Sequence, residues 1–435
     1  MSVSTTTFVT RRRWRVAHAG AALGLALTAL ASHAASAPVS GSDSALVQRG
    51  AYLAKAADCV ACHTTNPSQP FAGGLAFATP FGNLYSSNIT PDQQHGIGRM
   101  TDAQLIAAIR DGVGQHGKLY PAMPYTSYTG MTDADVQALV AYLRTIKPVA
   151  FDPPANTMPF PFNQRWAMTF WNLFNFTSGR YQNNPAKSVE WNRGAYLVTA
   201  LEHCQECHTP RNFMQGLSTS KQLGGSALGA WQAYNITSSK NSGIGGWSDA
   251  ELAQYLKSGV AEHKANAAGP MAEVIQNSSR FLTDPDIKAM IVYLRDVPAI
   301  NDQADSKPRY AWGQQYNDID QVRATAAPFA DANGKLNGAA LYNANCATCH
   351  TYTGKGIGHY PRLLQNSAVG APGGQNLVSV ILGGVHRVNN DGEAFMPPFR
   401  ASLDDAQVAA IANFMTTQFG NPAVVVTAEQ VKKSR

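Results

Sequence analysis

Three observations predict an all-α fold made of three tandem domains. The chain of 435 residues repeats with a period near 140 residues, because its six cysteines form three close pairs that begin at Cys59, Cys204 and Cys346. Each repeat ends in a capped amphipathic segment with apolar residues at helical spacing. No segment of comparable length alternates between apolar and polar residues, as a half-buried strand would. We therefore expect helical domains joined by irregular linkers.

The first 34 residues are expected to be a signal peptide. Four arginines within residues 11–15 precede an apolar run, from Val16 to Ala31, that ends in small residues. A membrane anchor is the alternative, but a bilayer span needs about 20 apolar residues and this run is shorter. These arginines supply four of the six net positive charges. The rest of the chain is nearly neutral and has no basic cluster, which argues against a nucleic-acid partner.

The repeat sets the boundaries of the expected domains. These are residues 44–147, 188–297 and 334–420. Each opens with a short helix, marked by the sequence R-G-A-Y-L at 49–53 and 193–197 and by a weaker echo at 338–342. Each closes with an amphipathic helix, expected over Thr132–Ile146, Thr283–Val297 and Leu403–Gln418. Hydroxyl side chains at Thr132 and Thr283 predict helix N-caps at the start of the first two.

Two linkers and a tail complete the predicted organisation. The first linker, residues 148–187, is rich in proline and aromatic side chains, including Trp166 and Trp171. We interpret this aromatic stretch as packing between domains, with a docking surface for a partner as the alternative. The second linker, residues 298–333, is polar and has no clear periodicity, and residues 421–435 form a short C-terminal tail.

Each cysteine pair is followed directly by a histidine, which gives three copies of the motif C-x-x-C-H. The residues of these motifs are Cys59, Cys62 and His63, then Cys204, Cys207 and His208, and then Cys346, Cys349 and His350. This spacing is the signature of c-type haem attachment: both sulfurs can reach the vinyl groups on one edge of the porphyrin, and the adjacent histidine then lies under the iron. A redox-active dithiol, a zinc site and a disulfide are the alternatives for one copy. Three copies with no cysteine left over favour three covalently attached haem c groups.

A methionine is the predicted second axial ligand in each domain, because a soft thioether stabilises ferrous iron. The candidates are Met123, Met271 and Met396. Each precedes its closing helix at a similar distance, and neighbouring prolines favour an extended loop that could hold the sulfur towards the iron. Their rivals are His116, His263 and His386. Met290 and Met415 are expected in the core, and His95, His203 and His359 on the surface or in loops.

The sequence resembles the three-haem cytochrome c subunit of bacterial membrane-bound alcohol, gluconate, sugar and aldehyde dehydrogenases. Besides the haem motifs, the resemblance rests on R-G-A-Y-L at 49–53, F-A-G-G at 71–74, T-P-F-G at 79–82, N-I-T-P at 88–91, Y-P-A-M-P-Y at 120–125, H-T-P-R-N at 208–212 and G-P-M-A-E-V at 269–274. It covers essentially the whole chain after residue 34. The fold that it implies is three tandem class I cytochrome c domains.

The resemblance also implies partners and a location. Such a subunit takes electrons from a dehydrogenase catalytic subunit that carries flavin, pyrroloquinoline quinone or another cofactor. It passes them to ubiquinone or a terminal oxidase on the periplasmic face of the inner membrane. Family members are often held there by a C-terminal amphipathic stretch, whereas only residues 421–435 follow the last helix here. Peripheral membrane association is therefore expected.

Two other functions fit parts of the pattern. A multihaem peroxidase would need an iron with an open sixth position, and a methionine candidate in every repeat argues against it. A free soluble electron shuttle would more often be one small domain. No catalytic residues are predicted in this chain. Because thioether bonds form after an unfolded chain has crossed the membrane, we expect the general secretory route and not the twin-arginine route that residues 11–13 resemble.

Overall fold

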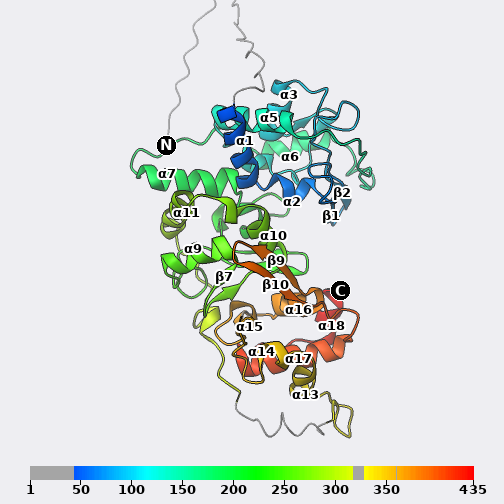
Figure 1. The fold of residues 1–435 in the computed structure, drawn as a ribbon, viewed down its shortest axis with the longest axis vertical. Helices are drawn as coiled ribbons and strands as arrows, with labels where there is room; N and C mark the ends of the chain where they lie inside the picture. Colours follow the sequence, from blue (N-terminus) through cyan, green and yellow to red (C-terminus); the bar gives the residue numbers. More distant parts are fainter. Residues whose placement is uncertain (1–43, 317–327, 359) are drawn as a thin grey trace, which may run out of the picture. The chain divides into compact units, whose positions relative to one another are not determined.

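The computed structural model describes residues 44–316, 328–358 and 360–435 (Figure 1). The predicted signal peptide, part of the second linker and His359 lie outside the described residues. The ranges 44–147, 188–297 and 334–420 are called the first, second and third repeat below. No described helix is both long and apolar enough to span a membrane.

The first repeat holds five helices and two short hairpins. Its helices are α1 (Ser44–Ala56), α2 (Cys59–His63), α3 (Asp102–Asp111), α4 (Tyr125–Tyr128) and α5 (Asp133–Thr145). Its strands are β1 (Ala76–Thr79), β2 (Gly82–Tyr85), β3 (Val113–Gly114) and β4 (Gly117–Lys118). The first linker adds α6 (Ala167–Asn175).

The second repeat follows the same order. Its helices are α7 (Val189–Tyr196), which continues into a π-helical turn at Leu197–Leu201, then α8 (Gln205–His208), α9 (Asp249–Ser258), α10 (Gly269–Asn277) and α11 (Asp284–Asp296). Short 3₁₀ turns lie at Thr219–Lys221, Ser279–Phe281 and Arg309–Ala311. Its strands are β5 (Ser226–Leu228), β6 (Trp231–Ala233), β7 (Val260–Ala261) and β8 (Ala265–Asn266).

The third repeat has one longer hairpin. Its helices are α13 (Gly338–Asn345), α14 (Ala347–His350), α15 (Ser367–Gly370), α16 (Gln375–Gly383) and α17 (Asp405–Phe419), and α18 (Ala428–Lys433) follows in the tail. Its strands are β9 (Val385–Asn389) and β10 (Gly392–Met396), which pair antiparallel with Gly392 opposite Asn389.

The closing helices agree with the prediction to within two residues. Thr132 and Thr283 cap α5 and α11 by accepting hydrogen bonds from the backbone N–H groups of Asp135 and Asp286. Asp404 caps α17 in the same way and forms a capping box with Gln407. Caps and helical periodicity were therefore sufficient to locate these three helices.

The expectation of an all-α fold is wrong in detail. The described residues contain five two-stranded antiparallel sheets where irregular loops were expected. Their strands are two to five residues long, which is too short to give a recognisable alternation of apolar and polar residues. The prediction of a helix-rich fold is confirmed, because each of these hairpins is a short connection between two helices.

One glycine in each repeat lets the opening and closing helices pack closely. A Cβ atom on Gly50 would lie 1.9 Å from the carbonyl oxygen of Ala138, on α5. The corresponding distances are 1.8 Å from Gly194 to Ala289 O and 2.3 Å from Gly338 to Ala410 O. A side chain at any of these positions would push the two helices apart. The glycine of the repeated R-G-A-Y-L sequence is thus a helix-crossing residue.

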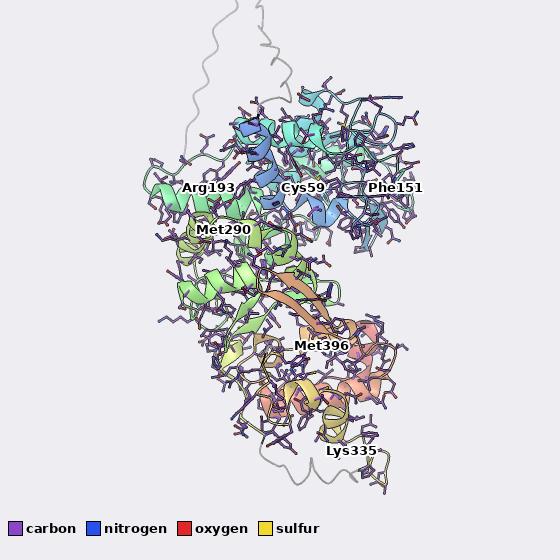
Figure 2. All side chains as sticks on the ribbon, viewed as in Figure 1. Cys59, Phe151, Arg193, Met290, Lys335 and Met396 are labelled. Atoms are coloured by element: carbon purple, nitrogen blue, oxygen red, sulfur yellow. The ribbon has the colours of Figure 1, made fainter. Side chains whose placement is uncertain are left out.

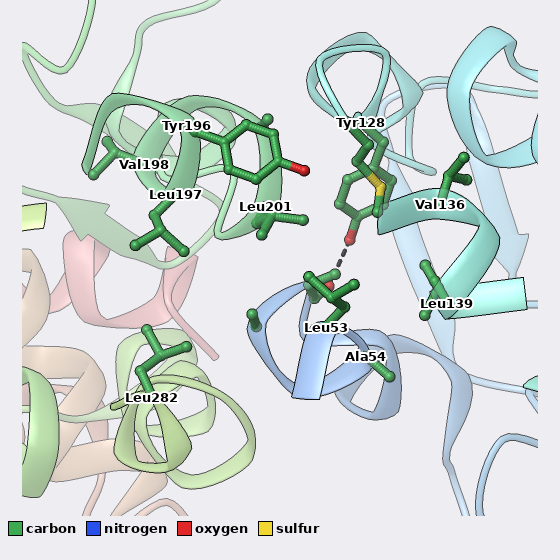
Figure 3. Packing of buried hydrophobic residues seen from close by; sticks show 14 of the residues in the cluster. Leu53, Ala54, Tyr128, Val136, Leu139, Tyr196, Leu197, Val198, Leu201 and Leu282 are labelled. Atoms are coloured by element: carbon green, nitrogen blue, oxygen red, sulfur yellow. Dashed lines mark hydrogen bonds between the residues drawn. The ribbon is translucent and has the colours of Figure 1, made fainter. Parts of the chain in front are cut away.

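The buried apolar residues form two separate clusters. The larger one spans the first and second repeats, and Figure 3 shows Leu53 of α1, Leu139 of α5 and Leu201 of the second repeat within it. There the Tyr128 hydroxyl donates a hydrogen bond to the carbonyl oxygen of Ala57, at 2.5 Å. The smaller cluster lies in the third repeat and its tail. Met290 and Met415 are buried in these clusters, as predicted.

Candidate haem sites

The three C-x-x-C-H motifs lie on equivalent short helices. Helix α2 begins at Cys59 and ends at His63, and in the other two repeats α8 and α14 begin one residue after the first cysteine and end at His208 and His350. Figure 2 marks Cys59 in the first of them. A helical turn brings residues i and i+3 to one face, so both thiols and the next histidine project from the same end of each helix.

Each of the three histidines is oriented by one hydrogen bond to the backbone. The Nδ1–H group donates to the carbonyl oxygen of Ser87 in the first repeat (2.7 Å), of Tyr234 in the second (2.6 Å) and of Pro361 in the third (2.9 Å). This bond fixes the tautomer and leaves Nε2 as the free nitrogen. Burial also lowers the pKa of all three imidazoles, which favours the neutral form that binds a metal.

The thiols do not have the character of a redox-active dithiol. Burial raises the pKa of Cys59, Cys62 and Cys346 to about 12, whereas a reactive dithiol needs a lowered thiol pKa. All six cysteines are free, so no pair forms a disulfide. The described residues also contain no group of three or more His, Cys, Asp or Glu side chains that could hold a zinc ion. The raised thiol pKa values therefore argue against a redox-active dithiol, and the residues fit covalent haem.

The three methionine candidates occupy different local structures. Met123 lies in a turn before α4 and packs against the larger core. Met396, which is labelled in Figure 2, is the last residue of β10 and pairs with Val385. Met271 lies in the first turn of α10, so the extended loop expected there is wrong. Proline is tolerated in a first helical turn, where its missing N–H costs nothing, and Pro270 is therefore compatible with the start of this helix.

The three rival histidines lie at the surface, and two of them have polar partners. His116 is exposed in the β3–β4 turn. His263 contacts Gln365 through Nδ1, and His386 contacts Glu393 through Nε2, with more than 40% of each imidazole exposed. His95 is exposed as expected, whereas His203 lies half-buried in a loop with its ring 5.4 Å from that of Tyr128.

Comparison with known proteins agrees with this geometry. A family model described as cytochrome c matches residues 47–147 and 336–418. The fructose dehydrogenase cytochrome subunit of Gluconobacter japonicus is 43% identical over 410 residues, which cover 89% of this chain and 82% of the relative. The chain belongs to the family of dehydrogenase cytochrome c subunits.

Two further relatives extend this result. The alcohol dehydrogenase (quinone) cytochrome c subunit of Komagataeibacter europaeus is 38% identical over 409 residues, covering 90% of this chain and 85% of the relative. The gluconate 2-dehydrogenase cytochrome c subunit of Pantoea cypripedii is 37% identical over 411 residues, covering 90% of each chain. Membership means that this cytochrome carries covalent haem c and transfers electrons, and that catalysis belongs to another subunit.

The second C-x-x-C-H motif lies close to side chains of the first repeat. The pKa of Cys62 is raised mainly by burial, and the nearby thiol of Cys207 from the other repeat raises it further. Thr126 and Ser127 of the first repeat donate hydrogen bonds to Glu206, which lies inside the second haem motif. Side chains of one repeat thus help to hold the attachment helix of the other.

A reciprocal pair of hydrogen bonds joins the opening and closing helices of these two repeats. The Tyr52 hydroxyl donates to Asp286 (2.5 Å), and the Tyr196 hydroxyl donates to Asp135 (2.7 Å). Each aspartate also binds an arginine of its own repeat: Arg49 pairs with Asp135, and Arg193 pairs with Asp286. Burial alone would raise the pKa of Asp286, but hydrogen bonds from Arg193 and Tyr52 lower it overall.

Sequence reasoning did not identify this interface, although a signal was present. The third repeat has Asn337, Ala340 and Gln407 at the positions equivalent to the arginine, the tyrosine and the aspartate. All three residues are thus present in the first two repeats and absent from the third, which indicates that they act together.

Buried carboxyl groups lie beside the first two haem sites. Burial raises the pKa of Glu202 to about 8, although a hydrogen bond from the Ser278 hydroxyl opposes this. Burial, with a contribution from Glu202, raises the pKa of Asp58 well above its usual range. Asp58 directly precedes Cys59, and one of its oxygens has no hydrogen-bond partner in the described structure. At neutral pH the Glu202 carboxyl group is therefore mostly protonated, and burial shifts Asp58 in the same direction.

The third repeat is attached through the β9–β10 hairpin and α16. Arg387 of β9 is 3% exposed and donates to the carbonyl oxygen of Ala267 in the second repeat. Asn376 of α16 binds the backbone of Gln232 through both its amide oxygen and its amide nitrogen, at 2.7 and 2.9 Å. Strand β10, which ends at Met396, therefore pairs with β9, and β9 packs on the second repeat.

Proposed function

We propose that this cytochrome is a three-haem electron relay, built from tandem cytochrome c domains at 44–147, 188–297 and 334–420. The observation that supports it is the repeated orientation of His63, His208 and His350 by one Nδ1–carbonyl hydrogen bond each. One such histidine is common in any protein, but three at equivalent places after a cysteine pair are typical of proximal haem ligands.

The proposed holding residues are the three cysteine pairs as thioether donors, the three histidines as proximal ligands, and Met123, Met271 and Met396 as distal ligands. When bound, each haem supplies one-electron redox chemistry. The protein contributes orientation of the imidazole, through the backbone carbonyl groups, and shielding from water, through the two apolar clusters. A methionine at the sixth position closes the iron to substrates and raises its reduction potential.

The proposed partners follow from the relatives. Their names associate cytochrome subunits with fructose, alcohol and gluconate dehydrogenases. We infer that a periplasmic dehydrogenase subunit donates electrons to this chain, and that ubiquinone or a terminal oxidase at the inner membrane accepts them. Peripheral attachment to the periplasmic face of that membrane is part of the proposal.

Carbon monoxide tests the ligand assignment, because it binds ferrous haem only where the sixth position is open. The wild-type protein should bind almost none, and Met123→Ala, Met271→Ala and Met396→Ala should each bind one equivalent. Met290→Leu is the matched control, since Met290 is buried in the core and this swap preserves side-chain volume. If the wild-type protein bound carbon monoxide stoichiometrically at one haem, an enzyme of the peroxidase type would replace the proposed relay.

A further inference from the structure

Helix α6 (Ala167–Asn175) is polar towards the protein and apolar towards the solvent. The Tyr125 hydroxyl donates to Oδ1 of Asn172, and Nδ2 of Asn212 donates to Oδ1 of Asn175, so both asparagines face inwards. The opposite face carries Trp166, Phe170, Leu173 and Phe174, each between 61% and 74% exposed. A helix on a water-exposed surface normally has the reverse polarity. This arrangement indicates an apolar environment outside α6.

The exposed apolar face continues into the segment before α6. Phe160 is 77% exposed, and Phe162 is half-exposed while its ring stacks on that of Phe81 with 4.4 Å between centroids. The α6 apolar surface is defined here as Phe160, Phe162, Trp166, Phe170, Leu173 and Phe174. Trp171, on the inner side of the helix, is buried and donates from Nε1 to the carbonyl oxygen of Met214. The linker therefore packs between repeats, as expected, and also presents an outer apolar surface.

The stretches that carry this surface contain basic but no acidic residues. The surface is built on and beside three stretches, 112–132, 153–189 and 207–248, and none of them contains an aspartate or a glutamate. Acidic residues next to these stretches contact them: Glu206 pairs with Arg211, Asp133 pairs with Arg180, and Asp111 accepts a hydrogen bond from Ser178. They contact one another directly through the α6 hydrogen bonds and through the bond from Arg165 to the carbonyl oxygen of Lys118. Lys118, Arg165 and Lys221 lie in these stretches, and no ion pair of theirs is formed within the part of the chain that the structure describes.

Residues 421–435 do not offer a comparable surface. Val424, Val426 and Val431 are buried in the core of the third repeat, with at most 8% of each residue exposed. Helix α18, which contains Val431, packs on α17 and has Lys432 and Lys433 in its last turn. Three of the four valines in this stretch are therefore buried inside the protein, whereas Val425 is 69% exposed.

We propose that the α6 apolar surface inserts into the interface of a bilayer that contains anionic phospholipids. Exposed Trp, Phe and Leu side chains favour the boundary between headgroups and acyl chains, and nearby Lys and Arg side chains attract anionic headgroups. The inference rests on the proposed membrane association and assigns it to named residues. It also holds the first haem site beside the lipid, because Tyr120 and Tyr125, which flank Met123, bind Phe162 and Asn172.

Vesicle flotation of the purified holoprotein tests this surface. The wild-type protein should bind vesicles that contain phosphatidylglycerol, and should bind more weakly to pure phosphatidylcholine or at high salt. Phe170→Ser combined with Leu173→Ser should weaken binding to the anionic vesicles by about tenfold. Phe329→Ser combined with Val425→Ser is the matched control, since both residues are more than half exposed, one in the second linker and one in the C-terminal tail. This control should stay within about twofold of the wild type.

Each remaining outcome would overturn the inference in a distinguishable way. If both double variants bind vesicles as well as the wild type, the assignment to α6 is wrong while membrane association survives. If the wild type binds no vesicles, membrane association itself fails, and unchanged haem content would leave the relay intact. If the α6 variant keeps vesicle binding but loses either a co-purifying dehydrogenase subunit or a dimeric state, the surface contacts protein and not lipid.

Discussion

The junction between the first and second repeats differs in kind from the junction between the second and third. The first two repeats share one apolar core and exchange hydrogen bonds through Tyr52 and Tyr196, and their junction buries carboxyl groups. The third repeat has its own core and is attached by polar contacts around a buried arginine, Arg387. The three copies of the motif thus lie in two repeats that share one core and in a third repeat that has a core of its own.

The largest expected effect comes from filling a helix crossing. Gly194→Ala should destabilise the first and second repeats together by about 3 kcal/mol, because its Cβ would overlap the carbonyl oxygen of Ala289 within their shared core. Gly338→Ala should destabilise the third repeat alone, since that core is separate. Limited proteolysis in increasing urea, read by mass spectrometry, reports which repeat opens.

Gly383→Ala is the control for this pair of variants, because no atom lies within 4 Å of the position its Cβ would take. Its cleavage pattern should match that of the wild type. Selective opening of the second repeat in Gly194→Ala, with the first repeat still protected, would contradict the shared core.

A smaller effect is expected from the reciprocal tyrosines. Tyr52→Phe and Tyr196→Phe each remove a hydrogen bond to a buried or half-buried aspartate, and each should lower the free energy of unfolding of the paired repeats by about 2 kcal/mol. Urea denaturation followed by fluorescence measures this. Tyr142→Phe is the control, because the hydroxyl of Tyr142 donates no hydrogen bond in the described structure. Equal urea midpoints for all three variants would show that these two hydrogen bonds do not stabilise the paired repeats.

The smallest effect concerns pH. The pKa of Glu202 is raised by burial to about 8 in the folded protein, above its ordinary value near 4.5, so the folded state binds the proton more tightly than the unfolded state does. The contribution of Glu202 to the free energy of unfolding is therefore fully present below about pH 4.5 and is lost as the pH rises towards 8. Glu202→Gln should leave Tm unchanged at pH 4.5 and raise it by several degrees at pH 8.

The amide of the Glu202→Gln variant keeps an oxygen that can accept the hydrogen bond from Ser278. The variant therefore removes the titration of residue 202 without removing this hydrogen bond. Asp391→Asn, at an exposed carboxyl group, is the control and should show no such trend in differential scanning calorimetry. A constant difference in Tm across this pH range would mean that Glu202 does not titrate as proposed.

The sequence predicted the features that depend on short motifs. The caps Thr132 and Thr283 and the buried Met290 follow from local spacing and are confirmed, whereas the attachment residues stay a prediction. Features that depend on distant partners were not predicted. The bond from Tyr52 to Asp286 joins residues that are 234 positions apart. The β9–β10 hairpin was missed because each of its strands has only five residues.

The aromatic linker is the most instructive case. Trp166 and Trp171 look alike in sequence, yet one is 65% exposed and the other is buried against the second repeat. Helical phase decides this difference, and the phase became visible only when the inward-facing asparagines of α6 were known. Composition could therefore suggest either packing or docking, while the structure shows packing on one face of the helix and an exposed apolar surface on the other.

The central claim is that all three repeats hold a covalent haem. Its most direct test is the intact mass of the denatured, purified protein, together with peptide mapping of the attachment sites. The account predicts a mass increment of three haem groups, with one on each of the pairs that begin at Cys59, Cys204 and Cys346. An increment of two, with one pair recovered as free thiols, would contradict it.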